Sequence, residues 1–295
     1  MVINKKNIQR RGNRQLHEIR PVSFVYNPFG FAPSSVLYRA GDTVVVASVS
    51  LNPGVPQFLR GKGEGWLTAE YEMLPISTRK RNVRESTLAQ RNARSVEISR
   101  LIGRVFRSVF DPSKLGEFTV YIDCDVLQAD GGTRTAAIAA VSLALSRACD
   151  IWHKNGIIPT DLTVQKVAAI SVGIKDSEVY LDLDQDEDNS VDADFNFVMT
   201  ESGEIIEIQG TCEKKPVSAD LFNQLYALGQ QGVEKVFEAW NFGLAENDAS
   251  KAALFNLALP SKSDEVLKPA FSTKDKNDKN LKTPLFSLGN RIAKK

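Results

Sequence analysis

The fold of this chain is decided by residues 118–149, FTVYIDCDVLQADGGTRTAAIAAVSLALSRAC. The first part alternates apolar and polar side chains with a period of two, which predicts a half-buried strand. A glycine pair follows at 131–132, and small apolar residues then run almost without a break through 136–145. A helix that is apolar on nearly every side is buried. The stretch therefore predicts a strand, a glycine turn and a buried central helix whose first turn holds Thr133 and Arg134.

The junction of the glycine turn and the helix has the chemistry of an anion-binding site. The first N–H groups of a helix lack partners within the helix, and the helix dipole places partial positive charge there. Two glycines allow the backbone to approach a ligand closely and to adopt positive φ. Arg134 adds a planar set of donors that matches phosphate oxygens. The residues also allow a plainer interpretation, in which the glycines form only a turn and Thr133 is only an N-cap.

Composition limits the class of protein. The 295 residues suffice for a sizeable core in one large or two modest domains, and 42% apolar with 25% charged residues is ordinary for a soluble globular protein. Because the net charge is only +1, any nucleic-acid binding depends on a local patch. The two histidines, His17 and His153, are far apart in the sequence, which argues against a zinc site and against a histidine-based triad.

The sequence also indicates a compartment. Cys124, Cys149 and Cys212 form no CxxC pair, so we expect buried thiols in a reducing environment. Residues 1–20 are basic but lack the apolar segment of a secretory signal. No window approaches about 18 apolar residues, so we expect no membrane span. We therefore expect a cytoplasmic protein that does not associate with membranes.

A basic segment, residues 78–94, precedes and opens an amphipathic helix. Its charged residues are Arg79, Lys80, Arg81, Arg84, Arg91 and Arg94, against Glu85 alone. Such a segment can form a concave basic patch suited to a phosphate backbone. Within the helix, Arg100, Arg104 and Arg107 share a face that is most simply solvated.

Seven acidic residues crowd residues 182–194. They are Asp182, Asp184, Asp186, Glu187, Asp188, Asp192 and Asp194. Like charges raise one another's pKa and destabilise the fold unless a cation is shared. One interpretation is a Mg²⁺ or Mn²⁺ site, since these hard cations prefer carboxylate oxygens; the other is a solvated acidic loop. Asp188 and Asp194 bracket the start of a predicted strand, which favours the metal site.

The remaining pattern mixes strands and helices, so we predict an α+β fold. Hairpins are expected around 41–42 and 175–178, strands at 66–71, 195–200 and 205–208, and a closing amphipathic helix at 221–240. We expect a catalytic domain over residues 1–244, with a basic arm at 1–14. From residue 245 lysine and asparagine become frequent and prolines interrupt the chain, so residues 245–295 are expected to form a largely disordered tail, with a short helix at 249–259.

Several motifs, taken together, point to one family. They are RPVSF (20–24), GDT (41–43), GVPQFLRGKGEGWLTAEYEMLP (54–75), RSVEISRLIGR (94–104), LGEFTVYIDCDVLQADGGTRTA (115–136), SVGI (171–174) and VMTESGEIIEIQGT (198–211). Over about residues 15–242 the chain closely resembles the ribonuclease PH family of phosphate-dependent 3′ exoribonucleases. Similar cores occur in polynucleotide phosphorylase and in exosome ring subunits.

The resemblance implies a fold and a set of site residues. The fold is of the ribosomal protein S5 domain 2 type, with mixed sheets packed around a buried central helix, and the oligomer is a ring-shaped hexamer, a trimer of dimers. The family's phosphate-binding residues match Arg94, Gly132, Thr133 and Arg134. Its RNA-contacting segment matches Arg79, Arg81 and Arg84. Its two essential aspartates match Asp188 and Asp194, which would bind Mg²⁺ or Mn²⁺ or protonate the departing 3′ oxygen.

The reaction implied is phosphorolysis of the last nucleotide of tRNA precursors and of other RNA 3′ ends. Inorganic phosphate is the co-substrate, a nucleoside diphosphate leaves, and the reverse reaction adds a nucleotide, so the activity is that of a tRNA nucleotidyltransferase. Two alternatives stay open: a catalytically silent RNA-binding ring subunit, and a metal-dependent nuclease that uses water.

Overall fold

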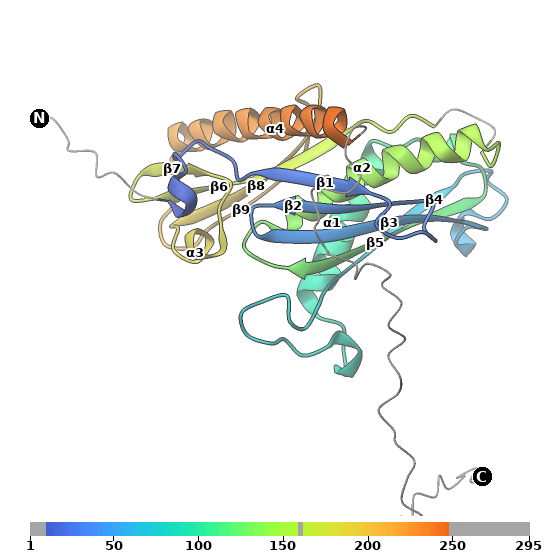
Figure 1. Ribbon diagram of the computed structural model, residues 1–295, viewed down its shortest axis with the longest axis horizontal. Helices are drawn as coiled ribbons and strands as arrows, with labels where there is room; N and C mark the ends of the chain where they lie inside the picture. The colour runs from blue at the N-terminus through green and yellow to red at the C-terminus, as the bar shows by residue number, and fades with distance from the viewer. Residues whose placement is uncertain (1–9, 159–161, 248–295) are drawn as a thin grey trace, which may run out of the picture. The chain divides into compact units, whose positions relative to one another are not determined.

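The computed structural model describes residues 10–158 and 162–247, which form an α+β fold with two sheets (Figure 1). The first sheet has the order β1-β2-β3-β5-β4, with β1 (Val22–Tyr26), β2 (Ser34–Ala40), β3 (Thr43–Pro53), β4 (Trp66–Met73) and β5 (Phe118–Gln128). The second has the order β7-β6-β8-β9, with β6 (Val167–Lys175), β7 (Glu178–Leu181), β8 (Ala193–Thr200) and β9 (Ile205–Cys212). The helices are α1 (Ala93–Ser108), α2 (Thr133–Lys154), α3 (Gln185–Asp188) and α4 (Ala219–Asn247). The predicted fold class is confirmed.

Strand β5 has the alternating pattern read from the sequence. Val120, Ile122, Cys124 and Val126 are buried. Strand β5 pairs antiparallel with β3 and parallel with β4. Parallel neighbours need a crossover connection, and α1 supplies it because it follows β4 in the chain and packs against it. The crossover also contains residues 74–92, which we call the basic loop.

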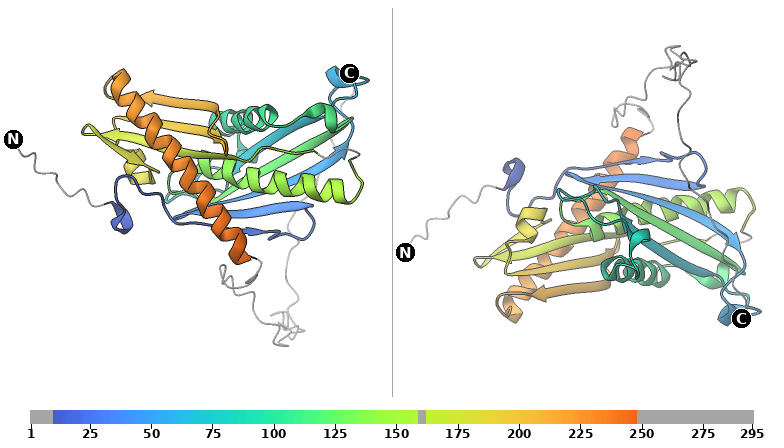
Figure 2. Two further views of the ribbon diagram at one scale, coloured as in Figure 1. Left: turned by 90° about the horizontal axis from the view of Figure 1, so that it is seen from above. Right: turned by 90° about the horizontal axis from the view of Figure 1, so that it is seen from below.

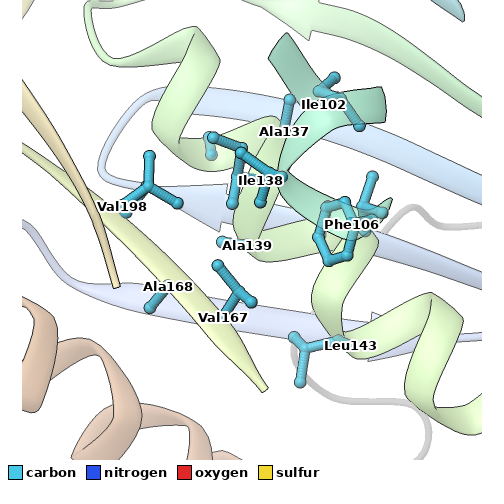
Figure 3. Packing of buried hydrophobic residues seen from close by; sticks show 14 of the residues in the cluster. Ile102, Phe106, Ala137, Ile138, Ala139, Leu143, Val167, Ala168 and Val198 are labelled. Carbon is cyan, nitrogen blue, oxygen red and sulfur yellow. The ribbon is translucent and has the colours of Figure 1, made fainter. Parts of the chain in front are cut away.

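Helix α2 is the centre of the core. It packs against β2 and β3 of the first sheet and against β6 of the second, and nearly all of its residues from Thr133 to Leu145 are buried. Figure 3 shows Ile138 and Ala139 of α2 beside Val167 of β6. The alanines of α2 let both sheets approach the helix closely, while each large apolar side chain buried there stabilises the fold by about 1.5–3 kcal/mol. The predicted buried central helix is confirmed.

Helix α4 covers another part of the second sheet. It packs against β6 and β8 and also touches β1 of the first sheet (Figure 2). Its buried side chains include Leu225, Leu228, Val233, Val236 and Phe237, as the helical spacing predicts. With helices packed against it, β6 is buried at every position from Val167 to Ile174, as expected for a strand covered on both faces.

Cys124 and Cys149 are buried, but Cys212 is exposed at the end of β9, so the prediction of a buried thiol was wrong there. The apolar window of α2 is long enough to cross a membrane, contrary to expectation, yet 78% of it is buried inside the protein, as in a core helix. The tail beyond residue 247, with its predicted short helix, and the first nine positions of the basic arm lie outside the described residues.

Candidate active site

The glycine turn before α2 is a point of close approach between the two halves of the fold. Gly131 has φ 79° and Gly132, the N-cap of α2, has φ 63°. A Cβ at Gly131 would lie 2.6 Å from the carbonyl carbon of Asp184 and 2.7 Å from the nitrogen of Gln185. Only glycine therefore fits, both because of the positive φ and because the loop before α3 leaves no room.

Two side chains fix this turn from behind. Arg20 donates from Nη1 to the carbonyl oxygen of Asp130 at 2.8 Å, and Thr43 Oγ1 donates to the carbonyl oxygen of Gly131 at 2.6 Å. These bonds fix the orientation of the carbonyl groups of the turn. The first N–H groups of α2, which lack partners within the helix, form its anion-binding end.

The N-terminus of α2 opens into a cavity of about 490 Å³. Its lining residues include Arg94 of α1, Gly131, Gly132 and Thr133 at the start of α2, and Asp188 at the end of α3. Four residues predicted for the site, Arg94, Gly132, Thr133 and Asp188, therefore converge on one space. The basic loop forms another wall, through Thr78, Asn82 and Val83.

Thr133 lies at the centre of a small hydrogen-bonded group. Arg94 Nη2 is 3.3 Å from Thr133 Oγ1, and the hydroxyl of Tyr71 is 2.9 Å from the same atom. Tyr71 points inward from β4 and is fully buried. Sequence reasoning missed Tyr71; the only available signal was its inward position in the alternating strand.

Arg134 lies beside the cavity but does not line it. Its guanidinium binds Glu97 of α1 at 2.8 Å and the side-chain oxygen of Gln209 of β9 at 3.0 Å. The positive charge still acts on the site, because it opposes the rise that desolvation causes in the pKa of Asp188 and Asp194. Arg134 therefore ties α1, α2 and β9 together and contributes charge from the edge of the site.

Asp188 and Asp194 form an interacting pair. The side chain of Asp188 is exposed at the cavity, yet desolvation by the surrounding protein raises its pKa, against the opposing charges of Arg94 and Arg134. Burial also raises the pKa of Asp194, and the charge of Asp188 raises it further. A carboxyl with a raised pKa can donate a proton to a leaving oxygen.

The same pair is the candidate metal site. Within residues 10–158 and 162–247, no cluster of three or more His, Cys, Asp or Glu side chains could hold a metal ion by itself. Mg²⁺ usually keeps several waters and binds through one or two carboxylates plus substrate phosphates. Two interacting carboxylates such as Asp188 and Asp194 match that second pattern.

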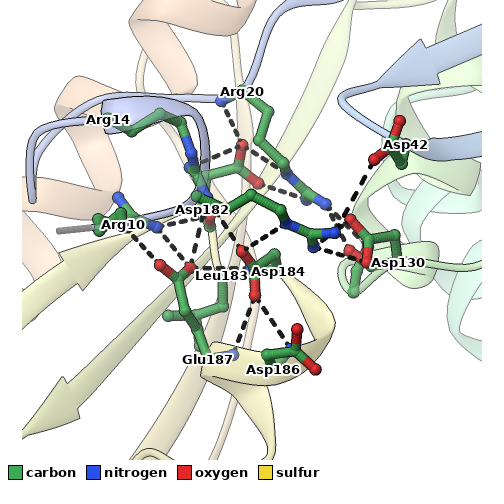
Figure 4. A network of polar contacts seen from close by, with 12 residues as sticks. Arg10, Arg14, Arg20, Asp42, Asp130, Asp182, Leu183, Asp184, Asp186 and Glu187 are labelled. Atoms are coloured by element: carbon green, nitrogen blue, oxygen red, sulfur yellow. Dashed lines mark hydrogen bonds and ion pairs between the residues drawn. The ribbon is translucent and has the colours of Figure 1, made fainter.

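The first half of the acidic segment has a different role from the second. Figure 4 shows Asp182, Asp184 and Glu187 bound to arginines from the start of the chain. The arginines are Arg10, Arg11, Arg14 and Arg20, of which all but Arg11 are buried. We predicted that crowded carboxylates would need a shared cation, and for these acids the cations are arginine side chains.

The pKa values follow this division. Burial alone would raise the pKa of Asp182, but the charge and hydrogen bonds of Arg20 outweigh it and lower the pKa. The pKa of Asp184 is also lowered, because backbone N–H groups of α3 and the charge of Arg11 oppose its burial. The single acidic cluster of the sequence is therefore two groups: a neutralised one behind the turn, and an interacting pair made of Asp188, which lines the cavity, and Asp194, which does not.

The predicted RNA-binding arginines lie on the basic loop. Arg79, Arg81 and Arg84 are exposed, and Arg79 is 3.4 Å from Asp186. Two arginines of the α1 stripe have structural contacts instead: Arg104 binds Glu207 at 2.7 Å, and Arg107 lies 4.8 Å from the centre of the Trp66 ring.

Comparison with known proteins identifies a family and a fold. Residues 18–149 match the 3′ exoribonuclease family, domain 1, and residues 166–232 match domain 2 of that family. The crystal structure of rice (Oryza sativa) Rrp46 has a TM-score of 0.65 at 19% identity, over 80% of this chain and 100% of that chain. The Archaeoglobus fulgidus exosome with RNA bound to the active site has a TM-score of 0.66 at 19% identity, over 79% and 93%. An archaeal exosome core has a TM-score of 0.63 at 21% identity, over 79% and 91%. At these identities the structures establish similarity of fold.

Proposed function

The chain belongs to the 3′ exoribonuclease family, and on this premise we propose that it is a phosphorolytic 3′-to-5′ exoribonuclease. Inorganic phosphate would occupy the cavity at the start of α2, and the 3′ end of an RNA would lie against the basic loop. The observation that carries the proposal is the convergence of Arg94, Thr133 and Asp188 on one cavity beside the N-terminus of a buried helix.

The chemistry of these groups favours phosphate over water as the attacking species. Arginine and helix N–H groups withdraw charge from what they bind, so they activate water poorly but hold an anion well. A phosphate oxygen would attack the phosphorus of the last phosphodiester, and the bond to the 3′ oxygen of the preceding nucleotide would break. Arg94 and Arg134 would reduce the repulsion between the two anions and position the attacker. The nucleoside diphosphate leaves, and the 3′ oxygen takes a proton.

Asp188 and Asp194 would act on the 3′ oxygen that leaves in the reaction. Their raised pKa values fit proton donation to the 3′ oxygen. Alternatively, the same pair in its ionised form would hold Mg²⁺ or Mn²⁺, which would stabilise charge on the phosphoryl oxygens.

We further propose tRNA precursors as substrates, together with other RNA 3′ ends, and a homohexameric ring as the working form in the cytoplasm. Support comes from the family match, and from the similarity of fold to exosome structures, one of which contains RNA in its active site. Arg79, Arg81 and Arg84 would contact the RNA backbone from the basic loop.

The test is activity on a tRNA with a 3′ extension, with and without phosphate, and identification of the released nucleotide. We expect cleavage that requires phosphate, saturates with it and releases nucleoside diphosphates. Nucleoside monophosphates released at an undiminished rate without phosphate would identify a hydrolase. RNA binding without any cleavage under either condition would identify a silent subunit.

A further inference from the structure

Tyr71 is a buried residue whose one polar atom reaches the wall of the cavity. Its side chain is 0% exposed on the inward face of β4, beside Leu67 and Ala69. Its hydroxyl donates to Thr133 Oγ1 at 2.9 Å. Burial raises the pKa of the phenol despite hydrogen bonds to Thr133 and Arg94, so the group remains protonated and remains a donor at neutral pH.

The hydrogen-bonding capacity of Thr133 is limited. A threonine hydroxyl has two acceptor lone pairs and one donor hydrogen. Tyr71 donates to this oxygen, and so does Arg94 from Nη2 at 3.3 Å, which occupies both lone pairs. Arg94 has no acceptor on its guanidinium, and the Tyr71 hydrogen is already directed at Thr133. The hydrogen of Thr133 must therefore point elsewhere.

The cavity is the remaining direction. Thr133 lines it together with Arg94 and Gly132, and no hydrogen bond from its hydroxyl to another described residue accompanies the two that it accepts. By contrast, the neighbouring Thr135 donates to the carbonyl oxygen of Gly132 at 2.8 Å, as threonines in helices commonly do. The hydroxyl of Thr133 is thus available as a donor for a ligand in the cavity.

We propose that Tyr71 is a positioning residue that holds the Thr133 hydroxyl as a donor toward a tetrahedral oxyanion in the cavity. The inference rests on the proposed function, since phosphate is the anion concerned. It also predicts which ionisation state of phosphate the site prefers, because a hydroxyl held as a donor favours oxygens that carry no hydrogen. Dianionic phosphate has three such oxygens and the monoanion has two, so the site prefers the dianion.

A double-mutant cycle tests the coupling directly. Tyr71→Phe keeps the ring and removes the donor, and it should raise the Kd for inorganic phosphate, measured by calorimetry on the whole chain, by about 10-fold. In a Thr133→Val background the same change should have no further effect, whereas in a Thr133→Ser background, which keeps the hydroxyl, the effect should persist. Tyr38→Phe is the matched control, because Tyr38 is another buried tyrosine of the first sheet and its hydroxyl accepts from Trp240.

A second measurement separates positioning from packing. Sulfate has four oxygens without hydrogen and serves as the reference anion. As pH falls through the second ionisation of phosphate, wild-type affinity for phosphate should fall relative to sulfate, and Tyr71→Phe should show a smaller fall, because its Thr133 hydroxyl is free to turn and accept. In turnover assays the variant should raise KM for phosphate more than it lowers kcat.

The possible results distinguish the role of Tyr71 from the proposed function. If Tyr71→Phe left the Kd for phosphate unchanged, or raised it as much in the Thr133→Val background as in the wild type, the proposed role of Tyr71 would be wrong. The proposal of phosphorolysis would be unaffected. Phosphate binding with the expected coupling but no phosphate-dependent cleavage would refute the proposed function alone. A wild-type chain that binds no phosphate would overturn both.

Discussion

Arg20 donates three hydrogen bonds to the carboxylate of Asp182. The backbone N–H and Nε of Arg20 donate to Oδ2 at 2.7 and 3.0 Å, and Nη2 donates to Oδ1 at 2.6 Å. Both side chains are about 5% exposed. Since the same guanidinium binds the carbonyl of Asp130, one residue joins the glycine turn to the loop that leads to Asp188. The geometry of the site therefore depends on a buried charge pair behind it.

Asp182→Asn should reveal that dependence. It should lower the free energy of unfolding near neutral pH by about 3–5 kcal/mol, because the Arg20 charge would stay buried without its partner. The pKa of Asp182 is lowered in the folded state, so its contribution is present above the ordinary aspartate pKa of about 3.9 and is lost as pH falls through the folded value. The variant should thus lose less stability than wild type in acid. Urea denaturation at neutral and acidic pH measures both effects. Asp150→Asn, at an exposed position, is the control.

Gly131→Ala should impair the site through backbone contact. The new Cβ would meet the backbone of Asp184 and Gln185 and push away the loop that carries Asp188. Gly203→Ala is the matched control, since Gly203 also has positive φ, 85°, but a Cβ added there would meet nothing within 4 Å. Both variants should lose about 1 kcal/mol from backbone strain, whereas only Gly131→Ala should lose activity. Equal activity in the two would show that the close approach is not needed.

Arg134→Ala should lower phosphate-dependent cleavage about 100-fold, as removal of a charge-stabilising donor does, while RNA affinity stays nearly intact. Because Arg134 opposes the rise in the pKa of Asp188 and Asp194, its loss should raise both values further and move the pH–rate profile to higher pH. Arg134→Lys keeps the positive charge and should shift the pH–rate profile less. A profile that is identical in wild type and both variants would contradict this account, and collapse of RNA affinity would make Arg134 an RNA contact.

Asp188→Asn and Asp194→Asn should each greatly reduce turnover without loss of the fold. Both carboxyls have raised pKa values, so each is disfavoured in its charged form and neutralising it should leave the free energy of unfolding near neutral pH unchanged or higher. Asp186→Asn, in the same short helix but outside the lining of the cavity, is the control. Chelation of divalent cations should abolish wild-type turnover, and Mg²⁺ should restore it. Variants as active as wild type would return the pair to a structural role.

Local patterns were enough to predict the elements of the site. The alternation of β5, the glycine pair and the apolar run of α2 all lie within one stretch, and each is governed by neighbours in sequence. The placement of Arg94 at the start of α1 followed from helical spacing. These predictions concern backbone conformation and periodicity, which short segments determine.

Partners that lie far apart in sequence could not be predicted in this way. The sequence shows that residues 1–20 are basic and that 182–194 is acidic, but no local pattern pairs Arg20 with Asp182, or Arg134 with Glu97. Tyr71 gave no signal beyond strand alternation, because a buried tyrosine is usually a core residue. The complementary charge of the two segments was the one available hint of their pairing.

The span between Arg20 and Asp182, 162 positions along the chain, has a consequence for biosynthesis. A ribosome releases Arg20 early and Asp182 much later, so the guanidinium has no carboxylate to meet while the first sheet and α2 are being made. The glycine turn can form then, but its alignment with Asp188 must wait for the second sheet. Nascent chains halted before residue 182 should therefore contain a folded α2 and first sheet without an organised phosphate pocket, and assembly of the catalytic centre should be among the last events of folding.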